Sequence, residues 1–298
     1  MHYTGTIWRP PYEAASLLLE VTAGCTHHQC RFCTLYNDLP FHFRLSPIEH
    51  IISDLRELQA VYRHRGGRRQ RVFLTGANPF VLSYEKLKRI DEQIHQYLPA
   101  VTTIGSFARI TDVAAKTDHE LEQLHAMGYT GLTIGIETAD DEALHFMNKG
   151  YTAADILTQC RRLDSAGIRY SFFYLAGISG AGRGEIGAQL TAKLCNQLHP
   201  DLIGANMLTL YPDSKLFHEV QKGTWTEEGE LEKYKEIRTL VQQLDISTTF
   251  AAMGASNAFQ LQGELPQDRT QLQAVLNEII ENVSEEELQR YRKSVYHL

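Results

Sequence analysis

The segment Gly24-Cys25-Thr26-His27-His28-Gln29-Cys30-Arg31-Phe32-Cys33 places three cysteines within nine positions, in a C-x4-C-x2-C spacing. It follows directly on Leu17–Thr22, an apolar and β-branched run that predicts a buried strand. The cysteines are therefore expected in a loop at the carboxyl end of a strand. In folds built from βα units, such loops carry the ligand and catalytic sites.

The rest of the chain alternates short apolar runs with longer segments of helical periodicity. The predicted strands are Leu17–Thr22, Val72–Thr75, Thr102–Ser106, Leu132–Ile136, Tyr170–Leu175 and Ala205–Leu210. The predicted helices lie at about 47–62, 84–97, 118–127, 140–148, 153–166 and 185–198. This βα repeat predicts a parallel sheet covered by helices, either doubly wound or closed toward a barrel, and periodicity alone does not choose between them.

After Leu210 the pattern becomes mainly helical, with helices expected near 228–243, 268–282 and 285–296. We therefore expect a core over residues 1–212 and a helical C-terminal extension over residues 213–298 that packs on the core. No Pro/Gly-rich linker marks a firm boundary between the two.

The composition is that of an ordinary globular protein, with 43% hydrophobic and 22% charged residues. A net charge of -7 gives no general electrostatic reason to bind a polyanion, so a nucleic-acid partner is not expected. The N-terminus lacks the features of a secretory signal, and no apolar run approaches the roughly 20 residues that cross a bilayer. The expected location is the cytoplasm, without membrane contact.

Five cysteines in a cytoplasmic chain, three of them clustered, favour a metal site over a disulfide framework. Three thiolates can hold three corners of a 4Fe-4S cubane and leave the fourth iron open to another ligand. The alternative is a non-catalytic site, with zinc completed by His27 or His28, or with an iron-sulfur centre. Cys160 and Cys195 lie on predicted helices and are expected to be buried thiols.

From about Trp8 to Asp268 the sequence resembles the radical S-adenosylmethionine (SAM) superfamily, whose commonest spacing is C-x3-C-x2-C with an aromatic residue before the last cysteine. Phe32 occupies that aromatic position, and the longer first gap resembles an uncharacterised subgroup related to elongator-type and methylthiotransferase-type enzymes. The resemblance implies an α/β fold, a partial (β/α)6 TIM-like barrel with a helical C-terminal extension.

The resemblance also implies an activity. Cys25, Cys30 and Cys33 would hold a 4Fe-4S cluster that cleaves SAM to methionine and a 5′-deoxyadenosyl radical, which abstracts hydrogen from an unknown substrate. An electron donor such as flavodoxin or ferredoxin would reduce the cluster. The protein would position the reactants and exclude water and oxygen, since the cofactor carries the hard chemistry. The sequence does not indicate the substrate or the oligomeric state.

Two further elements resemble SAM-contacting motifs of the superfamily. Thr75-Gly76-Ala77-Asn78-Pro79 is similar to a Gly-Gly-Glu-Pro element whose backbone meets the SAM amino group, with Asn in place of Glu. Gly135-Ile136-Glu137 is similar to a Gly-x-Glu element, with Lys149 in the place of a basic residue that pairs with the carboxylate. On the residues alone, Glu137 could equally be a helix N-terminal acid or a salt-bridge partner. The implied cofactor-binding residues are Gly76, Ala77, Asn78, Pro79, Ser106, Arg109, Glu137 and Lys149.

Two other patterns have a chemical interpretation. Arg63, Arg65, Arg68, Arg69 and Arg71 crowd one αβ connection. A solvated face is the favoured interpretation of this run, and RNA modification through a phosphate-binding patch is the alternative. The segment 182–187 spells G-x-G-x-x-G, but it follows the fifth predicted strand rather than the first, so dinucleotide binding is not favoured.

Overall fold

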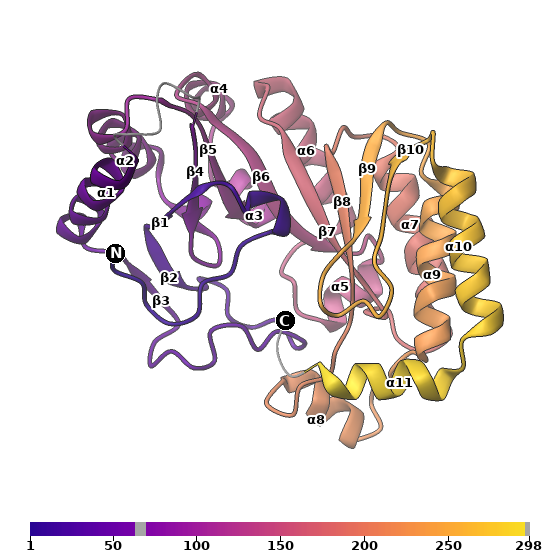
Figure 1. Ribbon diagram of the computed structural model, residues 1–298. Helices are drawn as coiled ribbons and strands as arrows, with labels where there is room; N and C mark the ends of the chain where they lie inside the picture. Colours follow the sequence, from indigo (N-terminus) through magenta and orange to yellow (C-terminus); the bar gives the residue numbers. More distant parts are fainter. Residues whose placement is uncertain (63–69, 296–298) are drawn as a thin grey trace. The chain divides into compact units, whose positions relative to one another are not determined.

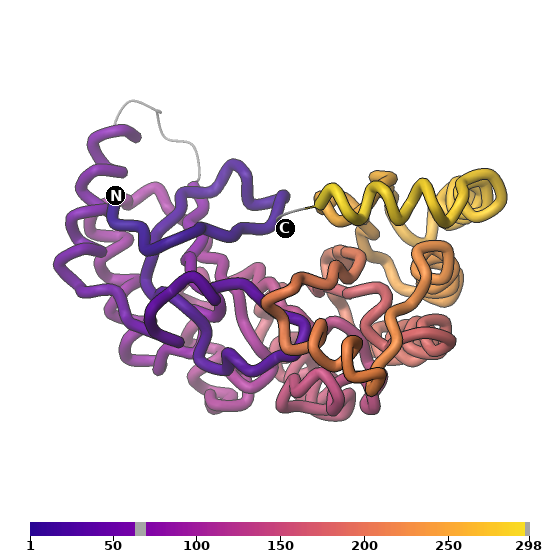
Figure 2. The backbone as a smooth tube through the Cα atoms, turned by 90° about the horizontal axis from the view of Figure 1, so that it is seen from below, coloured from indigo at the N-terminus to yellow at the C-terminus, as the bar shows by residue number. Residues whose placement is uncertain are grey.

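The computed structural model describes residues 1–62 and 70–295 of the chain. These residues form two compact units, whose backbone is traced in Figures 1 and 2. The first unit contains Met1–His28, Leu35–Ile134 and Arg161–Tyr170, and the second contains Gln29–Thr34, Gly135–Cys160 and the residues from Ser171 onward. Strand β6 (Tyr129–Glu137) and helix α6 (Ala153–Ala166) contribute residues to both units.

The first unit is built on parallel strands in the order β1-β4-β5-β6. Besides β6, these are β1 (Leu17–Glu20), β4 (Gln70–Thr75) and β5 (Val101–Ala108). The helices are α1 (Ile48–Tyr62), α2 (Tyr84–Tyr97), α3 (Ile110–Ala114) and α4 (Asp118–Ala126), with 3-10 turns at Pro11–Glu13 and Pro79–Val81. A short antiparallel pair, β2 (Thr22–Gly24) and β3 (Phe43–Leu45), follows β1.

Burial explains why these segments become parallel strands. In β4 the consecutive side chains of Val72, Phe73 and Leu74 are all buried, which requires cover on both faces of the sheet. Helix α4 begins at a capping box, in which Thr117 and Glu120 exchange hydrogen bonds between side chain and backbone. Burial and capping therefore account for these elements.

The second unit contains strands in the order β7-β8-β9-β10. They are β7 (Tyr170–Ala176), β8 (Leu202–Met207), β9 (Thr248–Ala252) and β10 (Leu261–Leu265), of which only β10 pairs antiparallel to its neighbour. The helices are α5 (Asp141–Phe146), α7 (Gly184–Cys195), α8 (Lys215–Gln221), α9 (Glu230–Gln243), α10 (Arg269–Asn282) and α11 (Glu285–Ser294). Helix α9 packs against both α7 and α10 (Figure 1).

The predicted alternation of strand and helix is confirmed, and the differences have physical reasons. Strands β9 and β10 were not predicted in the region expected to be helical. The predicted strand Ala205–Leu210 begins earlier, at Leu202, and also ends earlier, at Met207, because Leu208 packs in a separate apolar cluster. An apolar run has the same appearance in a strand and in a buried loop. The expected boundary between residues 212 and 213 stays a prediction.

Within the described ranges, no helix is both long enough and apolar enough to cross a membrane.

Candidate functional site

Cys25 lies in the first unit, at the end of the β2–β3 pair. Gly24 has φ +77°, and a Cβ at this position would lie 2.2 Å from the carbonyl oxygen of His42, so only glycine fits. The Cys25 amide donates to that same oxygen at 2.7 Å. The His28 amide in turn lies 3.5 Å from Cys25 Sγ and donates to it. The half-buried thiol is thus held by the backbone on both sides.

Asn78 ties the loop after β4 to the cysteine loop. Its side chain is 0% exposed. Oδ1 accepts from the Thr26 amide at 3.3 Å, and Nδ2 donates to Thr26 Oγ1 at 2.8 Å. Nδ2 also donates to the carboxylate of Asp112, at 3.1 and 3.2 Å. The amide of Asn78 is therefore engaged inside the protein, next to the residue that follows Cys25.

The other residues of the Gly76–Pro79 element lie against the same loop. Gly76 has φ +129°, and a Cβ there would approach Thr22 Oγ1 to 2.1 Å. The Ala77 amide donates to the carbonyl of Gly24 at 3.3 Å. Thr22 Oγ1 and Thr75 Oγ1 are buried and have no hydrogen-bond partner within the described part of the chain. Because buried hydroxyls are normally satisfied, these two leave capacity for a polar group at the strand ends.

Ser106 lies near the end of β5, and Arg109 follows that strand directly. Ser106 Oγ donates to the carbonyl of Phe107 at 2.8 Å, and the Arg109 guanidinium donates to Thr111 Oγ1 at 3.2 Å. The Arg109 amide donates to Asp112 at 2.8 Å. Burial raises the pKa of Asp112 to about 6, although its hydrogen bonds with Arg109 and Asn78 act in the opposite direction.

Asp112 is the central residue of this group that the sequence did not reveal. It is 2% exposed and accepts hydrogen bonds from Arg109 and Asn78. Lys116 lies behind it and donates to the Asp112 carbonyl at 3.2 Å, and burial lowers the pKa of Lys116 to about 8. The available signal was an acid at the third position of a helix that begins directly after a strand.

Cys30 and Cys33 belong to the second unit and lie on one turn, in which the Cys33 amide donates to the Cys30 carbonyl at 3.3 Å. Arg31 fixes this turn, because its amide donates to the carbonyl of Met147 at 3.0 Å and its carbonyl accepts from Leu216 at 2.7 Å. The side chain of Phe32 packs against a buried apolar cluster of the same unit. The aromatic residue before the last cysteine therefore anchors the turn.

Glu137 and Lys149 form the ion pair that the sequence suggested, with Lys149 Nζ 3.0 Å from Glu137 Oε1 and 2.9 Å from the carbonyl of Gly135. A Cβ at Gly135 would lie 2.4 Å from Glu137 Oε1, which explains the glycine. Glu137 itself has φ +66°, a conformation rarely adopted outside glycine. Tyr151, which the sequence did not single out, also donates to Gly135 at 2.6 Å.

The charge of Lys149 is fixed by its surroundings. Burial alone lowers the pKa of this lysine, but negative neighbours, of which Glu137 is the strongest, outweigh burial and raise it above the usual value. Cys30 is one of these neighbours. The second unit thus brings a cationic lysine, a carboxylate and a cysteine of the predicted site together. The salt-bridge interpretation of Glu137 is realised, and its contact with SAM stays a prediction.

The remaining sequence patterns have structural explanations where the structure describes them. Arg71 donates to Glu13 and to two backbone carbonyls in the first unit, so it belongs to an internal network rather than to a phosphate-binding patch. The other four arginines of the run lie outside the described residues. In the glycine-rich segment, a Cβ at Gly184 would meet the carboxyl of Glu228 and one at Gly187 would meet Ser179. These two glycines make room for side chains.

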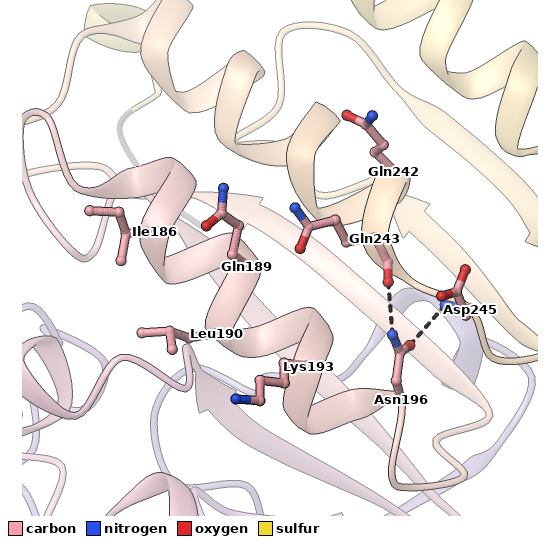
Figure 3. A pocket seen from close by; sticks show the side chains of 8 residues that line it. All are labelled: Ile186, Gln189, Leu190, Lys193, Asn196, Gln242, Gln243 and Asp245. Atoms are coloured by element: carbon pink, nitrogen blue, oxygen red, sulfur yellow. Dashed lines mark hydrogen bonds between the residues drawn. The ribbon is translucent and has the colours of Figure 1, made fainter.

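A groove on the second unit lies between α7 and α9 (Figure 3). Ile186 and Leu190 line it from α7, and Gln242 and Gln243 line it from α9. Asn196 connects the two helices, because its Nδ2 donates to the Gln243 carbonyl at 2.8 Å. None of the predicted site residues lines this groove, so it is separate from the candidate site.

All five cysteines lie in the described part of the chain and are thiols rather than disulfides. Within that part, no group of three or more His, Cys, Asp or Glu side chains is already arranged as a metal site. The roles expected for Cys25, Cys30 and Cys33 as ligands therefore stay predictions.

Comparison with known proteins identifies relatives for most of the chain. The model of the family described as "Radical SAM superfamily" matches residues 19–186. A curated relative, "Heme chaperone HemW" of Bacillus subtilis (strain 168), is 20% identical over 245 residues. That match covers 78% of this chain and 63% of the relative, so the chain spans less than two thirds of the relative's length.

Two solved structures share the fold at low sequence identity. The radical SAM methyltransferase TsrM from Kitasatospora setae matches with a TM-score of 0.56 and 17% identity, covering 70% of this chain and 39% of TsrM. Methylornithine synthase (PylB) matches with a TM-score of 0.54 and 14% identity, covering 93% of this chain and 85% of PylB. The predicted α/β fold, with a parallel sheet of the radical SAM partial-barrel type and C-terminal helices, is confirmed. Because the family model matches more than half of the residues of this chain, the chain belongs to the radical SAM superfamily.

Proposed function

We propose that the protein is a radical SAM enzyme in which Cys25, Cys30 and Cys33 hold a 4Fe-4S cluster. The observation that carries this proposal is the C-x4-C-x2-C loop, with Phe32 before the last cysteine, in a chain of this superfamily. The family implies both the cluster and SAM. When bound, they supply a 5′-deoxyadenosyl radical that abstracts hydrogen from a substrate.

The residues of the chain fit such a group. Thiols are the ligands that iron-sulfur clusters prefer, and these three are half-buried rather than sealed in the core. The His28 amide donates to Cys25 Sγ, and the positively charged Lys149 lies near Cys30. By contrast, burial raises the pKa of Cys195 to about 12, which suits an inert thiol.

We assign the SAM-binding role to the loops at the strand ends. The backbone at Gly76, Ala77 and Pro79 and the orphaned hydroxyls of Thr22 and Thr75 provide donors and acceptors for its polar groups. Asn78 contributes by fixing the loop rather than by direct contact, since its amide is engaged by Thr26 and Asp112.

The assignment continues in two other loops. Lys149 provides a fixed positive charge beside Glu137, where a carboxylate of the cofactor could be paired. Ser106, near the end of β5, and Arg109, directly after that strand, complete the set. An electron donor such as flavodoxin or ferredoxin remains part of the proposal.

The finer placement in the subgroup related to elongator-type and methylthiotransferase-type enzymes rests on the four-residue gap between Cys25 and Cys30. In the second unit Ser256 Oγ accepts from the Met207 amide at 3.1 Å, and Asn257 Nδ2 donates to the Ala205 carbonyl at 3.0 Å. These bonds support an extension over residues 213–298 that packs on the end of β8.

A second candidate is a non-catalytic iron-sulfur protein. The curated relative carries the name of a heme chaperone, so membership of the superfamily does not by itself require radical catalysis on a substrate. The two candidates differ in whether SAM is cleaved.

The test is reductive cleavage of SAM by oxygen-free protein reconstituted with iron and sulfide. With dithionite as the electron source, we expect 5′-deoxyadenosine and methionine to form in equal amounts. Cys30→Ala should abolish both products, while Cys195→Ala, a matched loss of a thiol elsewhere, should not. Formation of no 5′-deoxyadenosine above the Cys30→Ala control would refute the enzyme and favour the non-catalytic candidate.

A further inference from the structure

Helix α9 carries two charged side chains that are 0% exposed, Lys233 and Glu236. They are three residues apart, so they lie on the same face of the helix. Glu236 Oε2 accepts from the Gly177 amide at 2.7 Å, directly after β7. Lys233 Nζ donates to the carbonyl of Leu208, directly after β8, at 3.1 Å. A helix of the C-terminal extension therefore holds the carboxyl ends of two strands of the second unit.

The lysine is electrically balanced by its own neighbours. Lys233 Nζ lies 2.8 Å from Glu230 and 3.0 Å from Glu227. Arg292 of α11 donates to both oxygens of Glu230 at 3.0 Å and to Thr209 at 2.9 Å. The two positive charges of this cluster are balanced by the two carboxylates of Glu227 and Glu230. Lys233 therefore does not need Glu236, or a second acid that lies beside Glu236, to balance its charge.

That acid is Glu228, which is buried and whose carboxyl group lies beside that of Glu236. Two ionised carboxylates in such contact repel each other, so one proton must be shared between them. A Cβ at Gly184 would lie 2.0 Å from Glu228 Oε1, so the glycine at the start of α7 leaves the space that this carboxyl group fills. The Glu228 carboxyl group is thus packed against the start of α7.

The hydrogen bonds indicate which acid holds the proton. Glu236 accepts from the Gly177 amide and from the Tyr174 hydroxyl, which suits a carboxylate. Glu228 Oε2 is buried, and no donor reaches it from any described residue. A carboxylate oxygen in that position would be unsatisfied, whereas a protonated Glu228 donates its own hydrogen to Glu236.

We propose that Glu236 is a positioning residue that fixes the loop after β7, and that Glu228 supports it as a neutral carboxylic acid donating to the Glu236 carboxylate. The significance of this loop rests on the proposed function, because loops at the carboxyl ends of strands carry the ligands in βα folds. Gly177 has φ +90°, and a Cβ there would lie 2.8 Å from Lys233 Cε. The amide of Gly177 therefore donates to Glu236, while the Lys233 side chain fills the space that a Cβ at Gly177 would occupy.

The test compares Glu228→Gln with Glu236→Gln. Gln at 228 keeps a neutral donor, so the loop should remain fixed. Gln at 236 presents fewer acceptors to Gly177 and Tyr174, so the loop should loosen. We expect hydrogen exchange of the peptide over 175–184 to accelerate by about tenfold or more in Glu236→Gln, as for loss of a hydrogen bond to a charged group, and to stay near wild type in Glu228→Gln. Equal exchange in the two variants would overturn the proposal.

A second comparison keeps the test decisive if Glu236→Gln does not fold. Glu228→Ala removes the donor that Glu228→Gln retains, so exchange over 175–184 should accelerate in the first variant and not in the second. Identical behaviour of these two variants would contradict the neutral-donor role. Exchange over α2, in the first unit, reports whether each variant is folded.

SAM binding measured by calorimetry separates this inference from the proposed function. If wild-type protein binds SAM, its affinity should fall by about tenfold in Glu236→Gln and stay within about twofold in Glu228→Gln. An unchanged affinity in Glu236→Gln would reject the positioning role toward the cofactor. If wild-type protein binds no SAM, the proposed function fails, and the exchange experiment still decides whether Glu236 fixes the loop.

Discussion

Replacing Asn78 with aspartate would place a second carboxylate against the buried Asp112. Asn78 Nδ2 lies 3.1 Å from an Asp112 oxygen, and the substitution puts an oxygen in its place without changing the shape of the side chain. At that separation, two unit charges repel by about 5 kcal/mol with an effective dielectric constant of about 20. Protonating Asp112 at pH 7 costs less, about 1.4 kcal/mol, because the pKa of this carboxyl group is about 6 in the folded protein. We therefore expect Asn78→Asp to lose about 1.4 kcal/mol of unfolding free energy at pH 7.

This loss should shrink as the pH falls. Because the pKa of Asp112 is about 6, the extra proton costs almost nothing at pH 5, and nearly all of the loss should be regained there. The double variant Asn78→Asp/Asp112→Asn inverts donor and acceptor and should recover most of the stability. Urea unfolding of the three proteins at pH 7 and pH 5 is the assay. A loss that does not change with pH, or a double variant no better than Asn78→Asp, would refute the reasoning.

Three other substitutions test separate parts of the structure. Burial raises the pKa of Glu228 from 4.5 to about 10, so the folded state holds this proton more tightly, and the stability of the wild-type protein should fall as the pH rises from 4.5 to 10. Glu228→Gln should remove this contribution to the pH dependence of stability. Parallel pH profiles of the two proteins in urea unfolding would contradict this expectation. Gly24→Ala should lower the free energy of unfolding by about 2 kcal/mol or more, because φ is +77° and the Cβ would lie 2.2 Å from the His42 carbonyl oxygen. A loss below about 0.5 kcal/mol in urea unfolding would be inconsistent with that geometry. Lys149→Met should lower the free energy of unfolding by about 3 kcal/mol, because it leaves the largely buried carboxylate of Glu137 without its cation. The control Lys222→Met, in an exposed ion pair, should lower it by less than about 1 kcal/mol. Equal losses in the two variants in urea unfolding would show that burial of the Lys149–Glu137 pair contributes nothing.

The longer strands and helices of the first unit could be predicted because their signals are local, whereas the short elements β2, β3 and α3 were missed. The continuous apolar run of β4 and the capping box at Thr117 depend only on neighbouring residues. Strand β10 was missed although Leu261, Gly263 and Leu265 alternate with exposed residues, the pattern of a strand with one face in solvent. The helical periodicity of the neighbouring segments is a stronger pattern than five alternating residues, so the strand was not predicted.

The candidate site was predicted where a motif links residues close in sequence, as for Cys30 and Cys33 or for Glu137 and Lys149. Asp112 and Glu236 were not predicted, because each has partners more than thirty residues away. An acid on a helix has the same sequence appearance whether it faces solvent or accepts from a distant backbone amide. Only tertiary contacts distinguish the two cases.

The central claim is that three thiols leave one iron of a cubane without a protein ligand. Mössbauer spectroscopy of oxygen-free protein reconstituted with 57Fe, recorded with and without SAM, tests this most directly. We predict about four irons per chain and a change confined to one iron site when SAM is added. A spectrum that SAM does not alter, or a preparation that holds zinc and no sulfide, would contradict the account.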